Sequence, residues 1–303
     1  RRQRQMCIRD STEAMVRIQS PGQGLQPNRL NDLIGRRLPV SKSQGDVFFP
    51  SDLETPAATP RQYRFNQPFG LPVRYHDIAV LSQVCNLDLV EIHLSYKDLE
   101  VNLDEVLPER QIMGLVVHAP ELFAGDHTLD LCTDDASYRQ HSIAELQRVI
   151  DISQDLRNRF ACPDPVLLVT NVGGFSEHRH LDRQERQPLR ERLIESLKQL
   201  STGGEVEIIP QTMPPFPWHF GGQRYHNLFV DTEFIRSFCE EQGMRVCLDV
   251  SHSKLACNHL HQPFRQFLDQ ILPFTAHLHL ADAKDVDGEG LQIDDGEIDC
   301  VQL

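Results

Sequence analysis

The sequence predicts an α/β fold, a parallel barrel of the (β/α)8, or TIM barrel, type that begins near residue 69. Short apolar runs alternate there with longer stretches whose apolar residues recur at helical spacing. Such alternation is typical of a parallel sheet, because a crossover helix returns the chain to the next strand. Seven strand candidates over roughly 230 residues fit a closed barrel. The alternative is an open doubly wound sheet, but no Gly-x-Gly-x-x-Gly pattern follows these strands.

The predicted elements follow one another regularly along the chain. The longest predicted helix covers residues 137–160, and further helices are predicted over 188–201 and 231–243. The last of these ends at Gly243, a residue type that commonly caps a helix C-terminus. The strand candidates are residues 71–75, 89–94, 114–119, 166–170, 205–210, 245–250 and 276–281.

The chain ahead of the barrel has a different composition. Residues 1–10 have neither an apolar core nor a small-residue cleavage site, so they do not predict a secretory signal. Because they also differ in character from the chain that follows, we interpret them as a non-native or disordered leader. Residues 11–54 are short strand-like pieces broken by turn residues, and they predict a small, mostly β unit. Residues 55–68 are rich in Pro and Ala and predict a linker. The barrel then occupies residues 69–303, and we expect its eighth strand beyond the last residue.

Composition restricts the possible partners and compartment. The net charge is −14, with the acidic excess after the first 50 residues, so nucleic acid is not the expected partner. No run of apolar residues is long enough to predict a membrane span. The eight cysteines form no Cys-x-x-Cys pair, which indicates a reducing cytoplasm and no disulfide framework.

Polar side chains able to bind a metal follow most of the predicted strands. In a parallel barrel the carboxyl ends of the strands meet at one mouth, where active sites lie. A lone histidine at a strand end is more often structural, so the prediction depends on the whole series. Imidazoles and carboxylates together suit Zn²⁺, Mn²⁺ or Co²⁺. The series comprises Glu91, His93, His118, Asn171, Gln211, Asp249, His252, His277, His279, Asp282 and Glu289.

A metal ion held by this series can assist proton transfer next to a carbonyl group. A divalent ion stabilises an enediolate while a base moves the proton, and Glu91 and His118 are the candidate bases. Asp249 and His252 are open to a second interpretation, in which they cap a helix and pair with each other.

Three further side chains are candidates for substrate binding. Trp218 and His219 lie beside a Gly-Gly turn that suits a sugar-binding lid, although an ordinary surface loop is an equal alternative. Lys97 follows the second strand, where it would meet an anionic group, although a solvated helix start is the simpler interpretation.

The segments "DVSH", "HLHLADA" and "DGEGLQIDDGEID" resemble the xylose-isomerase-like barrel superfamily, which includes sugar phosphate isomerases, epimerases and endonuclease IV enzymes. The resemblance implies that Asp249, His252 and His279 bind a divalent metal, with Glu289 as a weaker match. Gln211 stands where the family usually has a ligand glutamate, and we assign it to substrate binding. The acidic body disfavours the DNA-repair branch.

The segments "VRIQSPGQGLQP", "LIGRRL" and "GDVFFPSDLE" resemble the SAF (antifreeze-like) domain of sialic acid (N-acetylneuraminate) synthases. The resemblance implies a module that closes over a partner subunit's synthase site and holds an amino sugar. It also implies a homodimer in a longer parent protein. Arg17 is the cation nearest the Pro-Gly turn and is therefore a candidate substrate contact.

Together these features predict a cytoplasmic enzyme of nonulosonic (sialic-acid-type) sugar biosynthesis. Its barrel would act as a metal-assisted isomerase or epimerase on a sugar or sugar phosphate. The alternative is a non-catalytic barrel that binds a sugar or scaffolds the synthase dimer.

Overall fold

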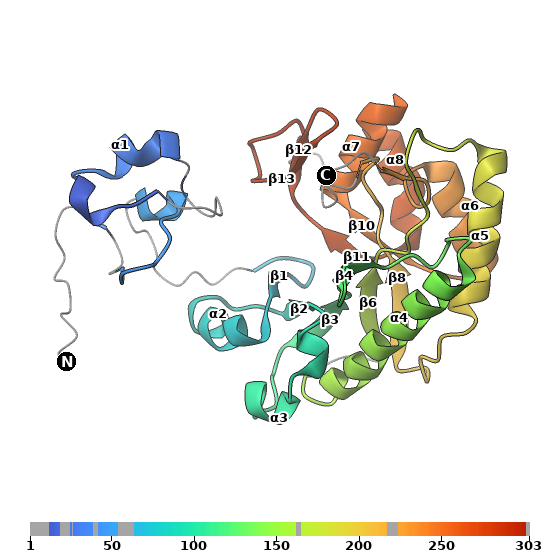
Figure 1. Ribbon diagram of the computed structural model, residues 1–303, viewed down its shortest axis with the longest axis horizontal. Coiled ribbons are helices and arrows are strands. Elements are labelled where there is room, and N and C mark those ends of the chain that lie inside the picture. Colours follow the sequence, from blue (N-terminus) through green and yellow to red (C-terminus); the bar gives the residue numbers. More distant parts are fainter. Residues whose placement is uncertain are drawn as a thin grey trace. The chain divides into compact units, whose positions relative to one another are not determined.

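The computed structural model describes residues 12–18, 25, 27–38, 42–53, 64–161, 165–216 and 224–300. The chain forms two compact units, residues 1–63 and residues 64–303 (Figure 1). The division falls inside the segment predicted to be a linker.

The first unit contains short helices where β-structure was expected. Its described residues include no strand of two or more residues. Pro, Asn, Asp and Ser recur in this segment and favour turns. In the described residues these turns are single turns of helix. Buried Asp52 pairs with Lys42 at 2.8 Å and accepts the Phe49 N–H. The elements are η1 (Glu13–Met15), η2 (Pro27–Arg29), α1 (Leu30–Leu33) and η3 (Pro50–Leu53).

The second unit is built on parallel strands that confirm all seven strand predictions. Five of them form one sheet in the order β1-β2-β3-β6-β8, and β10 pairs with β11. A parallel bridge between Gln211 and Cys247 connects the two sheets. In the described residues β1 and β11 therefore stand at the two ends of the series. The strands are β1 (Gly70–Val73), β2 (Leu89–His93), β3 (Gly114–His118), β6 (Val166–Thr170), β8 (Val206–Pro210), β10 (Val246–Asp249) and β11 (Thr275–His279).

Helices alternate with these strands and cover their outer side (Figure 1). No helix in the described part of the chain is long and apolar enough to cross a membrane. The helices are η4 (Tyr75–Asp77), α2 (Ile78–Val84), η5 (Asp98–Glu100), α3 (Leu103–Val106), α4 (Ala136–Arg157), α5 (Arg183–Leu197), α6 (Thr232–Gln242), α7 (Val250–Leu260), α8 (Phe264–Ile271) and η7 (Leu272–Phe274). Two-residue strands pair in the loops, namely β4 (Leu122–Phe123) with β5 (His127–Thr128) and β7 (Phe175–Ser176) with β9 (Tyr225–His226).

Two of the helix predictions show how capping sets helix ends. Helix α6 ends at Gln242, and Gly243 follows it in the left-handed conformation with φ of 63°, which confirms the predicted cap. Helix α5 begins at Arg183, five residues before the predicted start. Asp182 and Glu185 form a capping box there, and Pro188 is accommodated inside the helix.

The strands separate an apolar interior from a larger outer core. Val116, Val169, Ile209 and Cys247 pack together, one from each of four neighbouring strands, with Leu89 of β2 against them. Because side chains alternate along a strand, the residues two and four positions after Leu89 share its inner face. Glu91 and His93 therefore lie above this inner apolar cluster. The fold thus places the polar series at one mouth of the barrel.

We expect the aromatic cluster in the outer core to contribute strongly to stability. The Phe238 side chain is 0% exposed, and its ring centroid lies 5.3 Å from that of Phe229. Replacing Phe238 with Ala should lower the free energy of unfolding by about 3–5 kcal/mol, measured by urea denaturation. The control Phe65→Ala removes a ring that is 62% exposed and should cost much less. Equal losses would contradict this packing.

Candidate functional site

The carboxylate of Glu91 is the centre of a cluster of imidazoles. Glu91 is 4% exposed, and its Oε1 lies 2.6 Å from His93 Nε2. Oε2 lies 2.6 Å from His277 Nε2 and 2.9 Å from His279 Nε2. Burial alone would raise the pKa of the Glu91 carboxyl, but hydrogen bonds from His277, His279 and His93 outweigh it and hold the pKa far below its usual range. The contacts join β2 to β11, the last strand of the series.

The amide of Gln211 lies beside this cluster, where three predicted metal ligands converge. Its Nε2 is 3.0 Å from Asp249 Oδ2, 3.4 Å from His252 Nδ1 and 3.2 Å from His279 Nδ1. The structure therefore brings Asp249, His252 and His279 to one place, as the sequence suggested. An amide nitrogen occupies that point.

Asp249 has both roles that the sequence left open for it. Its Oδ1 accepts the backbone N–H of His252 at 2.8 Å and so caps the start of α7. Its Oδ2 faces Nδ1 of His279 at 3.2 Å. Burial would raise the pKa of the Asp249 carboxyl, but His252 and His279 outweigh it and lower the pKa to about 2. Asp249 is therefore an ionised group in the interior of the mouth.

His118 lies on the other side of the Gln211 amide. The Ala119 carbonyl oxygen is 2.9 Å from Nδ1, which therefore carries a hydrogen, because a carbonyl only accepts. Nε2 lies 3.2 Å from Gln211 Oε1. Burial and the nearby imidazole of His93 lower the pKa of His118, which favours the neutral ring. If the ring takes up a second proton at Nε2, Gln211 Oε1 can accept a hydrogen bond from it.

His252 is held between two acceptors. The Thr212 carbonyl oxygen lies 3.0 Å from Nδ1, and Glu289 Oε1 lies 3.0 Å from Nε2. Burial alone would lower the pKa of His252, but Asp249 and Glu289 raise it to about 9. Glu289 therefore meets the far nitrogen of His252, away from the point where Gln211 stands.

A hairpin made of β12 (Asp282–Lys284) and β13 (Gly288–Leu291) brings Glu289 to the site. Asp282 is buried and holds the turn that follows this hairpin. Its carboxylate accepts the backbone N–H groups of Ala283, Asp294, Gly296 and Ile298 at 2.8–3.1 Å. Asp282 is thus a backbone-organising residue that positions Glu289.

The structure describes two of the four remaining substrate-binding predictions. Lys97 is exposed in the turn before η5, with Nζ 5.9 Å from the centre of the Tyr96 ring. Arg17 is exposed in the first unit. Trp218 and His219 lie outside the described residues.

Sequence reasoning named His93 and His277 among the strand-end residues but gave neither a site role. A signal for both was present, because each lies two residues from a predicted site residue on the same strand. Residues so spaced share one face of the strand. Thr212 had no such signal, although its Oγ1 accepts the Asp249 N–H at 2.9 Å.

The cluster has the donor set of a transition-metal site. In the described residues, two groups have ligand atoms that all lie within 4.8 Å of one another. One is Glu91 with His93 and His118, and the other is Glu91 with His277 and His279. A carboxylate with imidazoles fits Zn²⁺, Mn²⁺ or Co²⁺. The residues present therefore fit a divalent ion, and both groups share Glu91.

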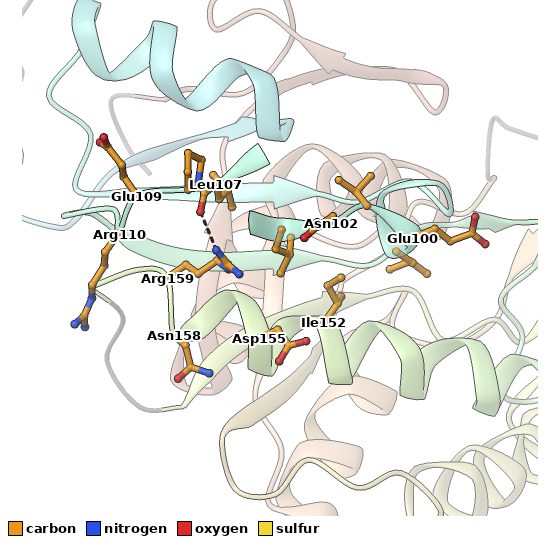
Figure 2. A pocket seen from close by; sticks show the side chains of 13 residues that line it. Glu100, Asn102, Leu107, Glu109, Arg110, Ile152, Asp155, Asn158 and Arg159 are labelled. Carbon is orange, nitrogen blue, oxygen red and sulfur yellow. Dashed lines mark hydrogen bonds between the residues drawn. The ribbon is translucent and has the colours of Figure 1, made fainter. Parts of the chain in front are cut away.

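A large hollow of about 770 Å³ lies elsewhere, between the η5–α3 segment and the end of α4 (Figure 2). Its polar side chains include Arg159, which donates to the Leu107 carbonyl oxygen at 2.9 Å and pairs with exposed Asp104 at 2.6 Å. These are surface contacts without a buried titratable group. We therefore place the candidate site at the Glu91 cluster and not in this hollow.

These features define a class of protein, the parallel α/β barrels with carboxylates and imidazoles at one mouth. Residues 82–303 match the family described as the xylose isomerase-like TIM barrel. The chain belongs to this family, which confirms the predicted barrel. The SAF resemblance of residues 11–54 stays a prediction.

Solved structures support the same fold. A D-tagatose 3-epimerase-like protein matches with a TM-score of 0.52 and 17% identity, covering 77% of this chain and 83% of the other. An L-ribulose 3-epimerase matches with a TM-score of 0.50 and 12% identity, covering 77% and 74%. A comparison with curated protein sequences finds no match. At 17% and 12% identity, these matches show that the chain shares the fold, and they show nothing about its activity.

The role of Asp282 predicts a pH-dependent contribution to stability. Burial would raise its pKa, but the four N–H groups outweigh it and lower the pKa below the unfolded value of about 3.9. The ionised group therefore adds stability above about pH 4, and this stability is lost as the pH falls through the lower folded pKa. Asp282→Asn should lower the urea midpoint at pH 7, with a difference from wild type that shrinks at acidic pH.

Exposed Asp134→Asn is the matched control and should leave the midpoint unchanged. Hydrogen exchange at Gly296 and Ile298 should accelerate only in the Asp282 variant. A pH-independent difference would show that the charge of Asp282 contributes nothing.

Proposed function

We propose that the barrel is a metal-assisted isomerase or epimerase acting on a sugar or sugar phosphate. The observation that carries this proposal is the buried Glu91 carboxylate, which contacts three imidazoles at the mouth of a xylose isomerase-like barrel. The likeness to two sugar epimerase folds supports the same class. A divalent ion bound here would supply positive charge for the oxygens of an enediolate.

His118 is the better placed of the two predicted bases. Its Nδ1–H donates to the Ala119 carbonyl oxygen, which leaves Nε2 to accept a proton from carbon. Glu91 has both oxygens engaged by imidazoles, so its role is to organise the cluster.

Epimerisation also requires a proton to return from the opposite face. The His252–Glu289 pair is the second candidate, because Gln211 separates it from His118. The Gln211 amide, with hydrogen-bonding groups on both sides, would bind a substrate oxygen between the two proton-transfer groups.

The finer assignments follow from the two resemblances. Among the predicted metal ligands, Asp249 and His279 face each other, whereas Glu289 reaches only His252. We assign Arg17, Lys97, Trp218 and His219 to substrate binding. The SAF-like segment supports a place in cytoplasmic sialic-acid-type sugar biosynthesis, in a homodimeric parent protein that also carries a synthase barrel.

One observation favours the alternative of a sugar-binding barrel without catalysis. Gln211 puts an amide where Asp249, His252 and His279 converge, and an amide is a weaker metal ligand than a carboxylate. In that case the polar mouth would bind a sugar by hydrogen bonds alone.

Exchange of substrate hydrogen with solvent distinguishes these two functions. We expect ketoses incubated with the protein in D₂O to gain deuterium beside the carbonyl, as measured by NMR. The rate should fall about 10²–10⁴-fold in His118→Asn, because the general base is lost. His127→Asn removes a buried histidine hydrogen-bonded to Ser142 and is the control. Sugar binding in calorimetry without any exchange would support the binding barrel instead.

A further inference from the structure

A single imidazole stands between two buried carboxylates at the centre of the site. Nε2 of His279 lies 2.9 Å from Glu91 Oε2, and its Nδ1 lies 3.2 Å from Asp249 Oδ2. A neutral imidazole carries one hydrogen and can donate to only one of these groups. The other nitrogen would then turn a lone pair toward a carboxylate, which is unfavourable away from water. The arrangement therefore requires a positive charge between the two carboxylates, either from a second ring proton on His279 or from a metal ion.

The contacts around the two carboxylates indicate where that positive charge lies. On the Glu91 side, His277 Nε2 lies 2.6 Å from the same oxygen that His279 approaches. Glu91, His277 and His279 are thus three metal-competent groups around one point. On the Asp249 side the Gln211 amide nitrogen, 3.0 Å from Oδ2, already supplies a donor. The metal-competent group therefore lies on the Glu91 side, and of its three residues Gln211 contacts only His279, at Nδ1.

We propose that Glu91, His277 and His279 bind a divalent transition-metal ion, and that Asp249 orients His279 from outside the coordination sphere. Asp249 would accept the Nδ1 hydrogen of His279, which leaves Nε2 free for the ion. The remaining contacts of Asp249 suit this role, because Oδ1 is used by the cap of α7. Of the predicted metal ligands Asp249, His252, His279 and Glu289, this assignment keeps His279 alone.

Three protein ligands leave a coordination position open, as catalytic metal sites require. The His93 side chain is 38% exposed and contacts the other oxygen of Glu91, so the cluster is reached from solvent at this point. In this part the inference rests on the proposed function, because a sugar hydroxyl or carbonyl oxygen would occupy the open position.

The test measures metal binding by the full chain without sugar. Zn²⁺, Mn²⁺ and Co²⁺ are supplied singly, and bound metal is measured by mass spectrometry after dialysis. We expect the wild type to bind an ion and to gain thermal stability with it. His277→Asn and Glu91→Gln should lose both effects. Asp249→Asn should keep the ion with an affinity about 10–100-fold lower, because only the orienting contact is lost.

His127→Asn again serves as the buried-histidine control and should keep the ion. Circular dichroism identifies any variant that fails to fold, and His277→Gln then takes the place of His277→Asn. Full occupancy in the folded His277 variant would overturn the proposal. So would loss of the ion in Asp249→Asn with retention in His277→Asn, or a wild type that binds none of the three ions.

Measuring both metal content and sugar hydrogen exchange distinguishes a failure of this inference from a failure of the proposed function. An ion that depends on His277, in a protein that exchanges no sugar hydrogen, would uphold the site and reject the isomerase or epimerase. Turnover by a protein that binds none of the three ions would reject the metal site and leave an isomerase or epimerase that works without metal.

Discussion

The Glu91 carboxylate is the group on which the site depends. It is almost fully buried, and a buried charge is costly unless it is paired and hydrogen-bonded. One imidazole from its own strand and two from β11 meet this requirement. Because β2 and β11 stand far apart in the strand order, the carboxylate links two distant parts of the series. The contacts between Glu91 and the three imidazoles therefore both connect distant strands and form the candidate metal site.

Two aspartates give this cluster its fixed frame. Asp249 caps α7 with one oxygen and faces His279 with the other, so the helix start and the imidazole are set together. Asp282 gathers four backbone N–H groups after β12 and so fixes the hairpin that carries Glu289. In both places a short motif that suggests metal ligands also organises the backbone. The same residue types serve both purposes because carboxylates accept several hydrogen bonds at once.

The strands could be predicted from the sequence because their apolar runs are short, separate and bounded by polar ends. The site was predicted less completely, and His277 shows why. A histidine inside a strand is by itself more often structural, and only the distant Glu91 gives it a chemical partner. The pairing depends on how β2 and β11 are brought together, which no local pattern encodes.

The start of α5 could have been predicted more closely, because Asp182 and Glu185 form a capping signal that is visible in the sequence. In residues 11–54 the turn-forming residues were read as breaks between strands, whereas their described parts form helical turns themselves.

Anomalous diffraction from crystals grown with Zn²⁺ or Mn²⁺ would test the central role of Glu91 most directly. We predict a peak about 2.0–2.2 Å from Glu91 Oε2, His277 Nε2 and His279 Nε2, with Asp249 hydrogen-bonded to His279. A peak beside Gln211, Asp249 and His252, or no peak at the mouth of the barrel, would contradict it.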